Sequence, residues 1–468
     1  MGSSFLFGYL INEDNPDDIR EMIDEAMSSA IYQKLKTSEN NPAIELLQVL
    51  AIKDLSAQGE PALQNYGKKI LGSLGKYTYT WDELADQLDE QAGAFFAYQR
   101  NGLISAIFWA IAHPSEVMHE VEASWFPLEY NGHKGNPNFR GSDFSLDGKS
   151  MQFYYGPGPT GDRLYNDGVL VYMDKLNKEG ANVLELRHNF QNMEKSSEAQ
   201  RIYEMMRYEQ EHSDSMRLLS MSFDTEAMRM SEQFCQFRTP REFMLLYAKF
   251  AMAKKGIDDT SHSIEHIQPW SHDKVLKAHK KDNGIFVGRD VLDKMTLKEA
   301  FLCANDVFTT LAIDNDHWNR LIENKEGKQR LGRMMQLGTQ AIISVGAVVK
   351  SLGDIHSPEN IKIALNKKLD ADLAASRVSG ACKQDIDRAV VENIALRLFF
   401  RLLHDDSPLS QDEVYSIAGA VVGRARLVEG RLIQWKRYEV LSDLLHFVGN
   451  QENVETLAAK LRAFQYYI

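Results

Sequence analysis

Three strand-like segments at regular intervals constrain the fold of this chain most strongly. Apolar and aromatic residues gather in short runs that begin near residues 151, 183 and 216. Each interval is about the length of one strand and the helix that follows it, which favours parallel strands joined by crossover helices. We therefore predict an α/β fold with a parallel-strand βαβαβ core.

The patterns on either side of these segments are helical. Apolar residues recur at helical spacing before residue 125 and after residue 300. A stretch rich in Gly, Asn, Pro and Asp over residues 125–149 indicates a linker or a long loop. We predict a helical N-terminal region (1–125), the α/β core (150–300) and a helical C-terminal domain (301–468).

Several helix starts carry a capping signal. A threonine or serine that is followed three residues later by glutamate is typical of a capping box at a helix N-terminus. This spacing occurs at Thr80, Thr239, Thr296 and Ser410. We expect a helix to begin at each of these four positions.

Charge and composition limit the classes of partner. The chain has 53 basic and 66 acidic residues, a formal net charge of −13, so the protein as a whole repels a phosphate backbone. We expect no nucleic-acid partner. No apolar run approaches the roughly 18 residues that span a bilayer, and the short apolar start has no basic flank. We expect a soluble protein with no membrane span and no signal peptide.

Polar residues follow the predicted strands at the point where each strand ends. In parallel sheets, ligands bind at this carboxyl edge. Gly156, Gly158, Thr160, Asp162 and Arg163 follow the first strand, Arg187, His188 and Asn189 end the second, and Asp224 ends the third. We predict an anion- or phosphate-binding cleft formed by these residues.

The residue types at this edge suggest distinct roles. A glycine-rich turn before a helix suits an anion, and Arg187 could hold a phosphate or carboxylate as a fork. His188 could transfer a proton near neutral pH, with Asp224 fixing its tautomer. We name His188 and Asp224 as candidate catalytic residues, and this chemistry requires no cofactor.

A structural interpretation of the same residues stays open. The sequence GPGPTGD at 156–162 is neither a Walker A loop nor GxGxxG, and its prolines favour a tight turn. Asp162 could cap the next helix, and Arg187 could pair with Glu185 on the same face of the strand.

A second group of candidate residues lies in a histidine-rich segment. His262-x-x-Glu265-His266 matches the inverted zincin pattern, in which two histidines bind zinc and the glutamate acts on water. Pro269 would end such a helix almost at its second ligand. The three cysteines lie far apart and form no CxxC pair. We therefore predict no bound metal, with His262 and His266 as the alternative metal ligands.

The same segment, Ser263-Ile264-Glu265-His266-Ile267-Gln268-Pro269, resembles the first strand of HNH-type nucleases. That resemblance implies that His266 activates water beside a divalent metal. The Gly-Asn-Leu turn and the later metal ligand of that family are not recognisable in this chain.

A broader resemblance covers residues 150–310. The runs Tyr155-Gly156-Pro157, 183–192 and 218–224 resemble uncharacterised effector-like proteins of intracellular bacteria, of chlamydia type and Legionella type. The resemblance implies a protein of the bacterial cytoplasm or one delivered into a host cytosol, with a host protein as partner.

Two classes of function follow. The cleft favours a hydrolase or transferase that acts on a phosphate-containing or glycosidic substrate. The alternative is a non-catalytic protein that binds a partner through its helical domain.

Overall fold

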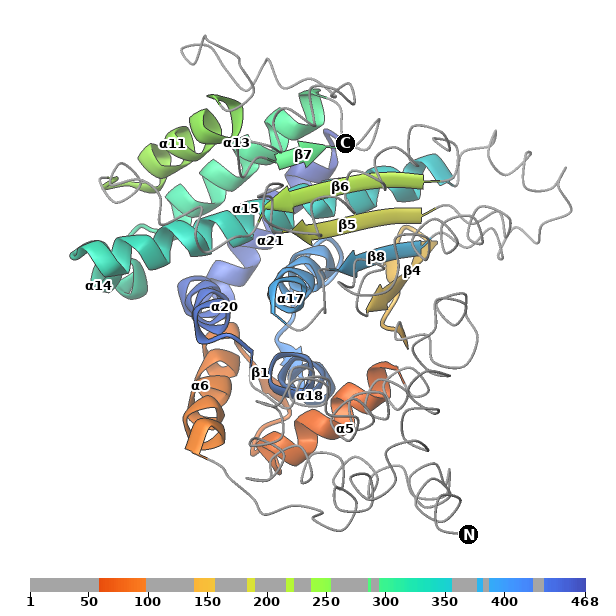
Figure 1. Ribbon diagram of the computed structural model, residues 1–468, viewed down its shortest axis with the longest axis vertical. Coiled ribbons are helices and arrows are strands. Elements are labelled where there is room, and N and C mark those ends of the chain that lie inside the picture. The colour runs from red at the N-terminus through yellow and green to blue at the C-terminus, as the bar shows by residue number, and fades with distance from the viewer. Residues whose placement is uncertain are drawn as a thin grey trace, which may run out of the picture. The chain divides into compact units, whose positions relative to one another are not determined.

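The computed structural model describes residues 59–97, 139–155, 183–189, 216–222, 237–253, 285–287, 294–355, 377–381, 387–423 and 433–468. The helices in these ranges are α5 (Glu60–Leu71), α6 (Trp81–Ala97), α11 (Pro240–Ala253), α13 (Lys294–Leu311), α14 (Asp316–Ile322), α15 (Lys325–Ile355), α17 (Arg388–Arg401), α18 (Gln411–Ala418), the π-helix η5 (Gly419–Gly423), α20 (Trp435–Val448) and α21 (Gln451–Gln465) (Figure 1). The strands are β1 (Thr78–Tyr79), β2 (Phe139–Arg140), β3 (Phe144–Leu146), β4 (Lys149–Tyr155), β5 (Val183–Asn189), β6 (Met216–Ser222), β7 (Ile285–Val287), β8 (Arg377–Ala381) and β9 (Leu409–Ser410).

The chain forms two compact units, each built from segments that are distant in the sequence. Of the described residues, the first unit contains 59–79, 86–97, 139–140, 409–423 and 433–435. The second unit contains 80–85 and the described residues of 141–408 and 436–468. The three consecutive regions expected from the sequence, 1–125, 150–300 and 301–468, stay a prediction.

Close contact between helix backbones holds the first unit together. A Cβ atom at Gly67 of α5 would lie 1.8 Å from the carbonyl oxygen of Tyr415 in α18. A Cβ atom at Gly419 of η5 would lie 1.9 Å from the carbonyl oxygen of Leu63 in α5. Because only hydrogen fits at both positions, the two glycines let α5 cross α18 and η5 at short range.

A mixed sheet forms the strand part of the second unit. Its order is β4-β8-β5-β6-β7, with β3 beside β4. The strands β4, β8, β5 and β6 are paired in parallel, whereas β7 and β3 are antiparallel to their neighbours. The sheet therefore combines segments from residue 144 to residue 381.

The predicted fold class, a parallel βαβαβ core with helical flanks, is wrong, and so is the description of the chain as an α/β protein. The three predicted strands are present as β4, β5 and β6, but β8 lies between the first two. No helix is described between β4 and β5 or between β5 and β6, and 70% of the described part is helical. The reason is that β8, formed by residues 377–381, pairs with both β4 and β5. The consecutive strands β4 and β5 are therefore not adjacent in the sheet.

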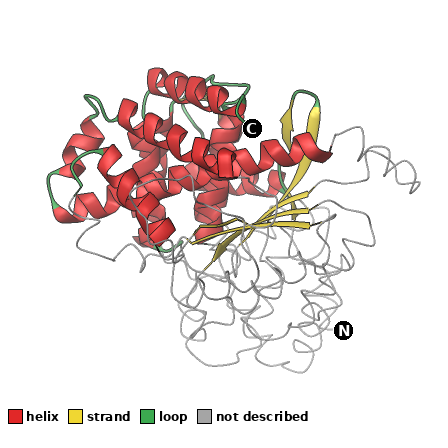
Figure 2. Cartoon of the chain, turned by 90° about the horizontal axis from the view of Figure 1, so that it is seen from above, coloured by secondary structure: helices red, strands yellow, loops and turns green. Residues whose placement is uncertain are grey.

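The long helix α15 and the shorter α17 both pack against this sheet. α15 contacts β3, β4, β5 and β6, and α17 contacts β5 and β8. Figure 2 shows helices gathered on one side of the strands. The strand residues Phe153, Leu186, Leu218 and Val378 are fully buried. The core of the second unit therefore lies between the sheet and its helices.

One polar contact fixes β8 in its place between β4 and β5. Asn393 of α17 is fully buried, and its Nδ2 donates a hydrogen bond to the carbonyl oxygen of Gly380 in β8 (2.9 Å). A Cβ atom at Gly380 would lie 1.9 Å from Oδ1 of Asn393. Position 380 therefore requires glycine as long as Asn393 makes this bond.

We expect Gly380→Ala to lower the free energy of unfolding by about 1–3 kcal/mol, because the added methyl group displaces Asn393. Chemical denaturation measures the change. Gly353→Ala, on the exposed side of α15 with no atom near its Cβ position, is the matched control. It should raise stability by about 0.5–1 kcal/mol because alanine favours a helix. Equal effects of the two substitutions would contradict the packing argument.

Candidate functional site

The carboxyl ends of β8, β5 and β6 meet at one edge of the sheet. β5 and β6 end in register, with Asn189 opposite Ser222. Arg187 lies opposite Ser220 on one side and opposite Ala381, the last residue of β8, on the other. We name this region, made of the last residues of β5, β6 and β8, the carboxyl edge.

The structure places only part of the predicted cleft. The backbones of Arg187, His188 and Asn189 form the last three positions of β5, at the carboxyl edge. The other predicted site residues lie outside the described residues: Gly156, Gly158, Thr160, Asp162, Arg163, Asp224, His262 and His266. The predicted roles of all these residues stay predictions.

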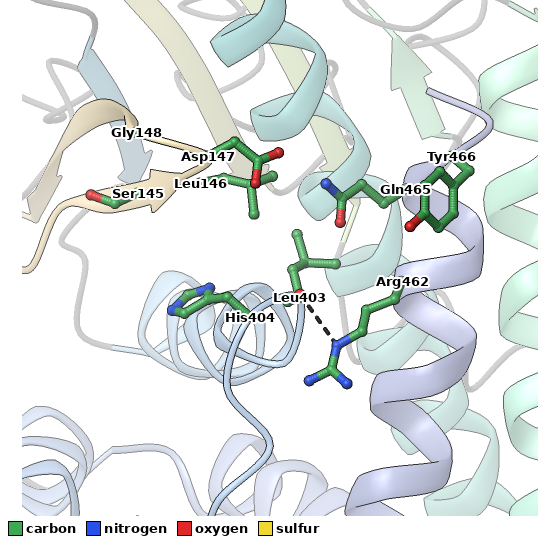
Figure 3. Close-up of a pocket in the computed structure, with 9 residues that line it drawn as sticks. All are labelled: Ser145, Leu146, Asp147, Gly148, Leu403, His404, Arg462, Gln465 and Tyr466. Atoms are coloured by element: carbon green, nitrogen blue, oxygen red, sulfur yellow. Dashed lines mark hydrogen bonds between the residues drawn. The ribbon is translucent and has the colours of Figure 1, made fainter.

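A pocket that no sequence pattern indicated lies at the amino end of β4, away from the carboxyl edge. It has a volume of about 500 Å³, and it is lined by the turn between β3 and β4, the residues after α17 and the last turn of α21 (Figure 3). Asp147 and Gly148 form the turn, and both have positive φ angles (52° and 75°). We call this cavity the hairpin pocket.

The hairpin pocket contains both hydrogen-bond donors and hydrogen-bond acceptors. Arg462 donates from Nε to the carbonyl oxygen of Leu403 (3.2 Å) and pairs through Nη1 with Asp406 (3.1 Å). On the facing wall, Asp147 extends towards Gln465 (Figure 3). Because Asp406 balances the charge of Arg462, the pocket offers donors and acceptors without an excess of positive charge.

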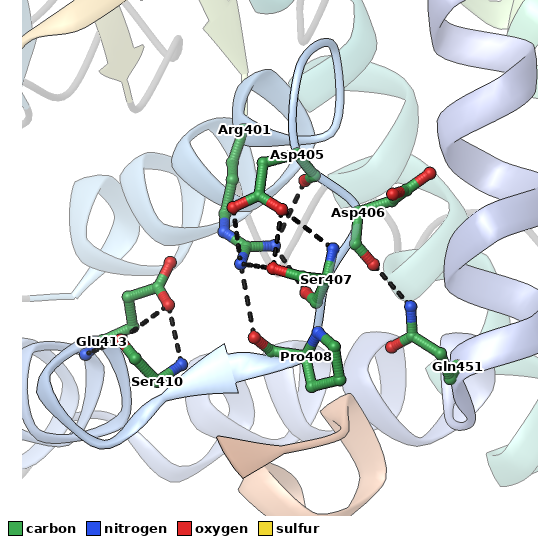
Figure 4. A network of polar contacts seen from close by, with 8 residues as sticks. All are labelled: Arg401, Asp405, Asp406, Ser407, Pro408, Ser410, Glu413 and Gln451. Carbon is green, nitrogen blue, oxygen red and sulfur yellow. Dashed lines mark hydrogen bonds and ion pairs between the residues drawn. The ribbon is translucent and has the colours of Figure 1, made fainter. Parts of the chain in front are cut away.

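Arg401 orders the loop that supplies one wall of the hairpin pocket. Its guanidinium donates to the carbonyl oxygen of Ser407 (2.8 Å) and to the Ser407 hydroxyl (3.1 Å), and it pairs with Asp405 (3.1 Å) (Figure 4). Partial burial raises the pKa of Asp405, but hydrogen bonds from Ser407 and the charge of Arg401 lower it overall. Gln451 donates to the carbonyl oxygen of Asp406 in the same loop.

A buried ionic network lies among the helices of the second unit. Arg330 of α15 donates twice to Asp443 of α20, from Nη2 to Oδ1 (2.7 Å) and from Nε to Oδ2 (3.0 Å). His317 of α14 contacts the same carboxylate through Nε2 (3.0 Å), and Arg320 Nη2 contacts His317 Nδ1 (2.7 Å). Burial lowers the pKa of Arg330, but the hydrogen bonds and charge of Asp443 raise it overall.

The contacts of His317 distinguish this network from a proton-transfer site. An Asp–His pair also occurs in proton-transfer sites, where one ring nitrogen faces the nucleophile. Arginine can only donate, so Nδ1 of His317 accepts from Arg320 and Nε2 donates to Asp443. Both ring nitrogens are therefore occupied by protein groups, and neither is left to take a proton from a ligand.

A second buried carboxylate lies on α17. Glu392 is 1% exposed, and its burial raises its pKa well above the ordinary value of 4.5, although the charge of Arg437 acts in the opposite direction. Burial also raises the pKa of Tyr247, which accepts a hydrogen bond from Gln340 Nε2 (3.3 Å). Both groups are buried in the helical core, and neither lines the hairpin pocket.

We expect Asp443→Ala to lower the free energy of unfolding by about 1.5–3 kcal/mol, because it removes the charged hydrogen bonds of the partly exposed Arg330 and the partner of the buried His317. Urea denaturation measures the loss. The control is Asp306→Ala, which removes the surface ion pair with Lys460 (2.6 Å) and should cost about 0–1 kcal/mol. A loss of under 1 kcal/mol at Asp443 would contradict its central role.

Glu392 should make stability depend on pH. Since its folded-state pKa is raised, its favourable contribution is complete below the unfolded-state pKa and is lost as pH rises through the folded-state pKa. We expect Glu392→Gln to gain stability relative to the parent as pH rises above the unfolded-state pKa of glutamate towards neutral pH. The exposed Glu455→Gln is the control and should follow the parent at each pH. The melting temperatures of both proteins are measured across this pH range. A difference between the parent and Glu392→Gln that does not change with pH would contradict the argument.

Metal sites, membrane spans and similarity to known proteins also bear on function. Among the described residues, no three His, Cys, Asp or Glu side chains form a group that could hold a metal ion. None of the described helices combines the length and the apolar content that crossing a bilayer requires. No protein-family model, no curated protein and no solved structure matches this chain.

Proposed function

We propose that the protein binds a ligand bearing a phosphate or carboxylate group at the carboxyl edge, with Arg187 as the anion-binding residue. The observation that supports this proposal is the register of the parallel strands: Arg187 of β5 lies between Ser220 of β6 and Ala381 of β8. Ligands of parallel sheets bind at this edge because the loops that follow the strands converge there.

Arginine suits this position for a chemical reason. Its guanidinium presents several N–H donors in a fixed plane and can bind two oxygens of one phosphate or carboxylate. A bond of this charged type contributes about 1.5–3 kcal/mol. The net charge of −13 supports a small anion rather than a nucleic acid, since the protein as a whole repels a phosphate backbone.

His188 extends the proposal from binding to turnover. It is the next residue of β5, opposite Met221, and an imidazole titrates in the range that proton transfer needs at neutral pH. Asp224 follows the end of β6 by two residues and would fix the imidazole tautomer. Hydrolysis or group transfer at a phosphate-containing or glycosidic centre is the corresponding reaction class.

The cellular setting belongs to the proposal as well. The resemblance of residues 150–310 to effector-like bacterial proteins supports the bacterial cytoplasm or a host cytosol as location. A host protein would then be a partner in addition to the small ligand. This part rests on the resemblance alone.

Arg187→Ala should weaken the binding of inorganic phosphate and phenyl phosphate by about 10- to 150-fold and leave the melting temperature nearly unchanged. Isothermal titration calorimetry measures the affinity. Arg217→Ala, the same change near the amino end of β6 opposite Leu184, should bind like the parent. The proposal fails if neither anion binds the parent, or if Arg187→Ala binds as well as the parent.

The catalytic part is tested separately with His188→Ala. If His188 acts as general base, this variant should lose hydrolysis of p-nitrophenyl phosphate and keep its affinity for phosphate. If the parent does not hydrolyse p-nitrophenyl phosphate, the catalytic part of the proposal is refuted and only the binding part stands. If His188→Ala melts at a lower temperature and also binds phosphate more weakly, His188 is structural.

A further inference from the structure

The hairpin pocket lies away from the carboxyl edge. Its turn, Asp147-Gly148, precedes the amino end of β4, whereas the carboxyl edge lies where the parallel strands end. β4 and β5 run in the same direction, because both pair in parallel with β8. A ligand in the hairpin pocket would therefore occupy a second site at the opposite end of the sheet.

Several side chains of the hairpin pocket have hydrogen-bonding atoms to spare. The side chains of Ser145, Asp147, His404 and Gln465 make no hydrogen bond to any described residue. Arg462 uses Nε and Nη1 for Leu403 and Asp406 and leaves Nη2 available among the described residues. The pocket is thus lined by a carboxylate, an amide, an imidazole and part of a guanidinium.

The charge of these groups argues against an anion as the ligand. Arg462 is already paired with Asp406, while Asp147 has no ion pair among the described residues. A phosphate or carboxylate would therefore meet an unbalanced carboxylate across the cavity. A neutral ligand with many hydroxyl groups fits better, because each hydroxyl both donates and accepts.

The apolar part of the hairpin pocket fits the same chemistry. Tyr466 lines the pocket and is 91% exposed, so its ring offers a face to solvent. Leu146 and Leu403 add apolar surface beside the polar groups. A sugar presents C–H groups on one face and hydroxyls at its edge. The volume of about 500 Å³ lies within the roughly 300–1,000 Å³ of small-molecule sites.

We propose that the hairpin pocket binds a neutral saccharide, with Tyr466 against the sugar ring and Asp147 and Gln465 on its hydroxyls. This site is independent of the anion site proposed at the carboxyl edge. It assigns a binding role to the β3–β4 turn and to the last turn of α21.

The test uses the full chain and a panel of glucose, galactose, mannose, N-acetylglucosamine and maltose, followed by protein NMR. We expect at least one sugar to shift the resonances of Asp147, His404 and Gln465 in a saturable way. Tyr466→Ala should weaken that binding by about tenfold or more. Tyr467→Ala, a neighbouring tyrosine that is 59% exposed and does not line the pocket, should bind like the parent.

A second variant separates charge from shape. Asp147→Asn keeps the left-handed turn, because asparagine tolerates a positive φ, and removes the carboxylate. It should weaken sugar binding without changing the melting temperature. The proposal is overturned if no sugar of the panel binds, if Tyr466→Ala and Tyr467→Ala bind equally, or if inorganic phosphate shifts the pocket resonances instead. The phosphate result at Arg187 has no bearing on these outcomes.

Discussion

The helical part of the second unit depends on the contacts that the buried carboxylate of Asp443 makes with two neighbouring helices. A fully buried charge is costly unless opposite charge and hydrogen bonds surround it. Here Arg330 supplies the opposite charge and two hydrogen bonds, and His317 supplies a further contact. Its partners come from α14 and α15, so one residue of α20 fixes three helices relative to one another. Because α15 also contacts four strands of the sheet, the same carboxylate holds the helix that supports the strands.

Helix starts could be predicted from the sequence because capping is decided within four residues. The helices α6, α11 and α18 begin directly after Thr80, Thr239 and Ser410, as their capping signals predict. At Ser410 both bonds of the capping box are present. The start predicted directly after Thr296 is wrong by three residues, since α13 begins at Lys294. The residues that cap a helix can therefore be recognised in the sequence, although the exact first residue of a helix is harder to assign.

The order of the strands could not be predicted in the same way. β8 has five residues, two of them the small Ser379 and Gly380, and its position depends on Asn393 of another element. No local pattern carries that information. The β3–β4 hairpin is a different case, because Asp-Gly between two strands is a strong turn signal. Residues 125–149 were predicted to form a linker or a long loop, and β3 and the turn lie within this range. The hairpin and its pocket were therefore not predicted. Its distant wall, with Arg462 and Gln465, has no sequence signal at all.

The two proposed sites share one helix, and this sets how they could depend on each other. Near its start, α17 holds β8 at the carboxyl edge through Asn393, and at its end Arg401 orders the loop that lines the hairpin pocket. Asn393 donates to the carbonyl oxygen of Gly380, and Arg401 donates to that of Ser407, so each residue helps to fix the main chain of another element. Sites prepared in this way lose little freedom when a ligand binds. Any coupling between them along this route would need α17 to move as a rigid body, and its packing on both α15 and the sheet opposes such a shift.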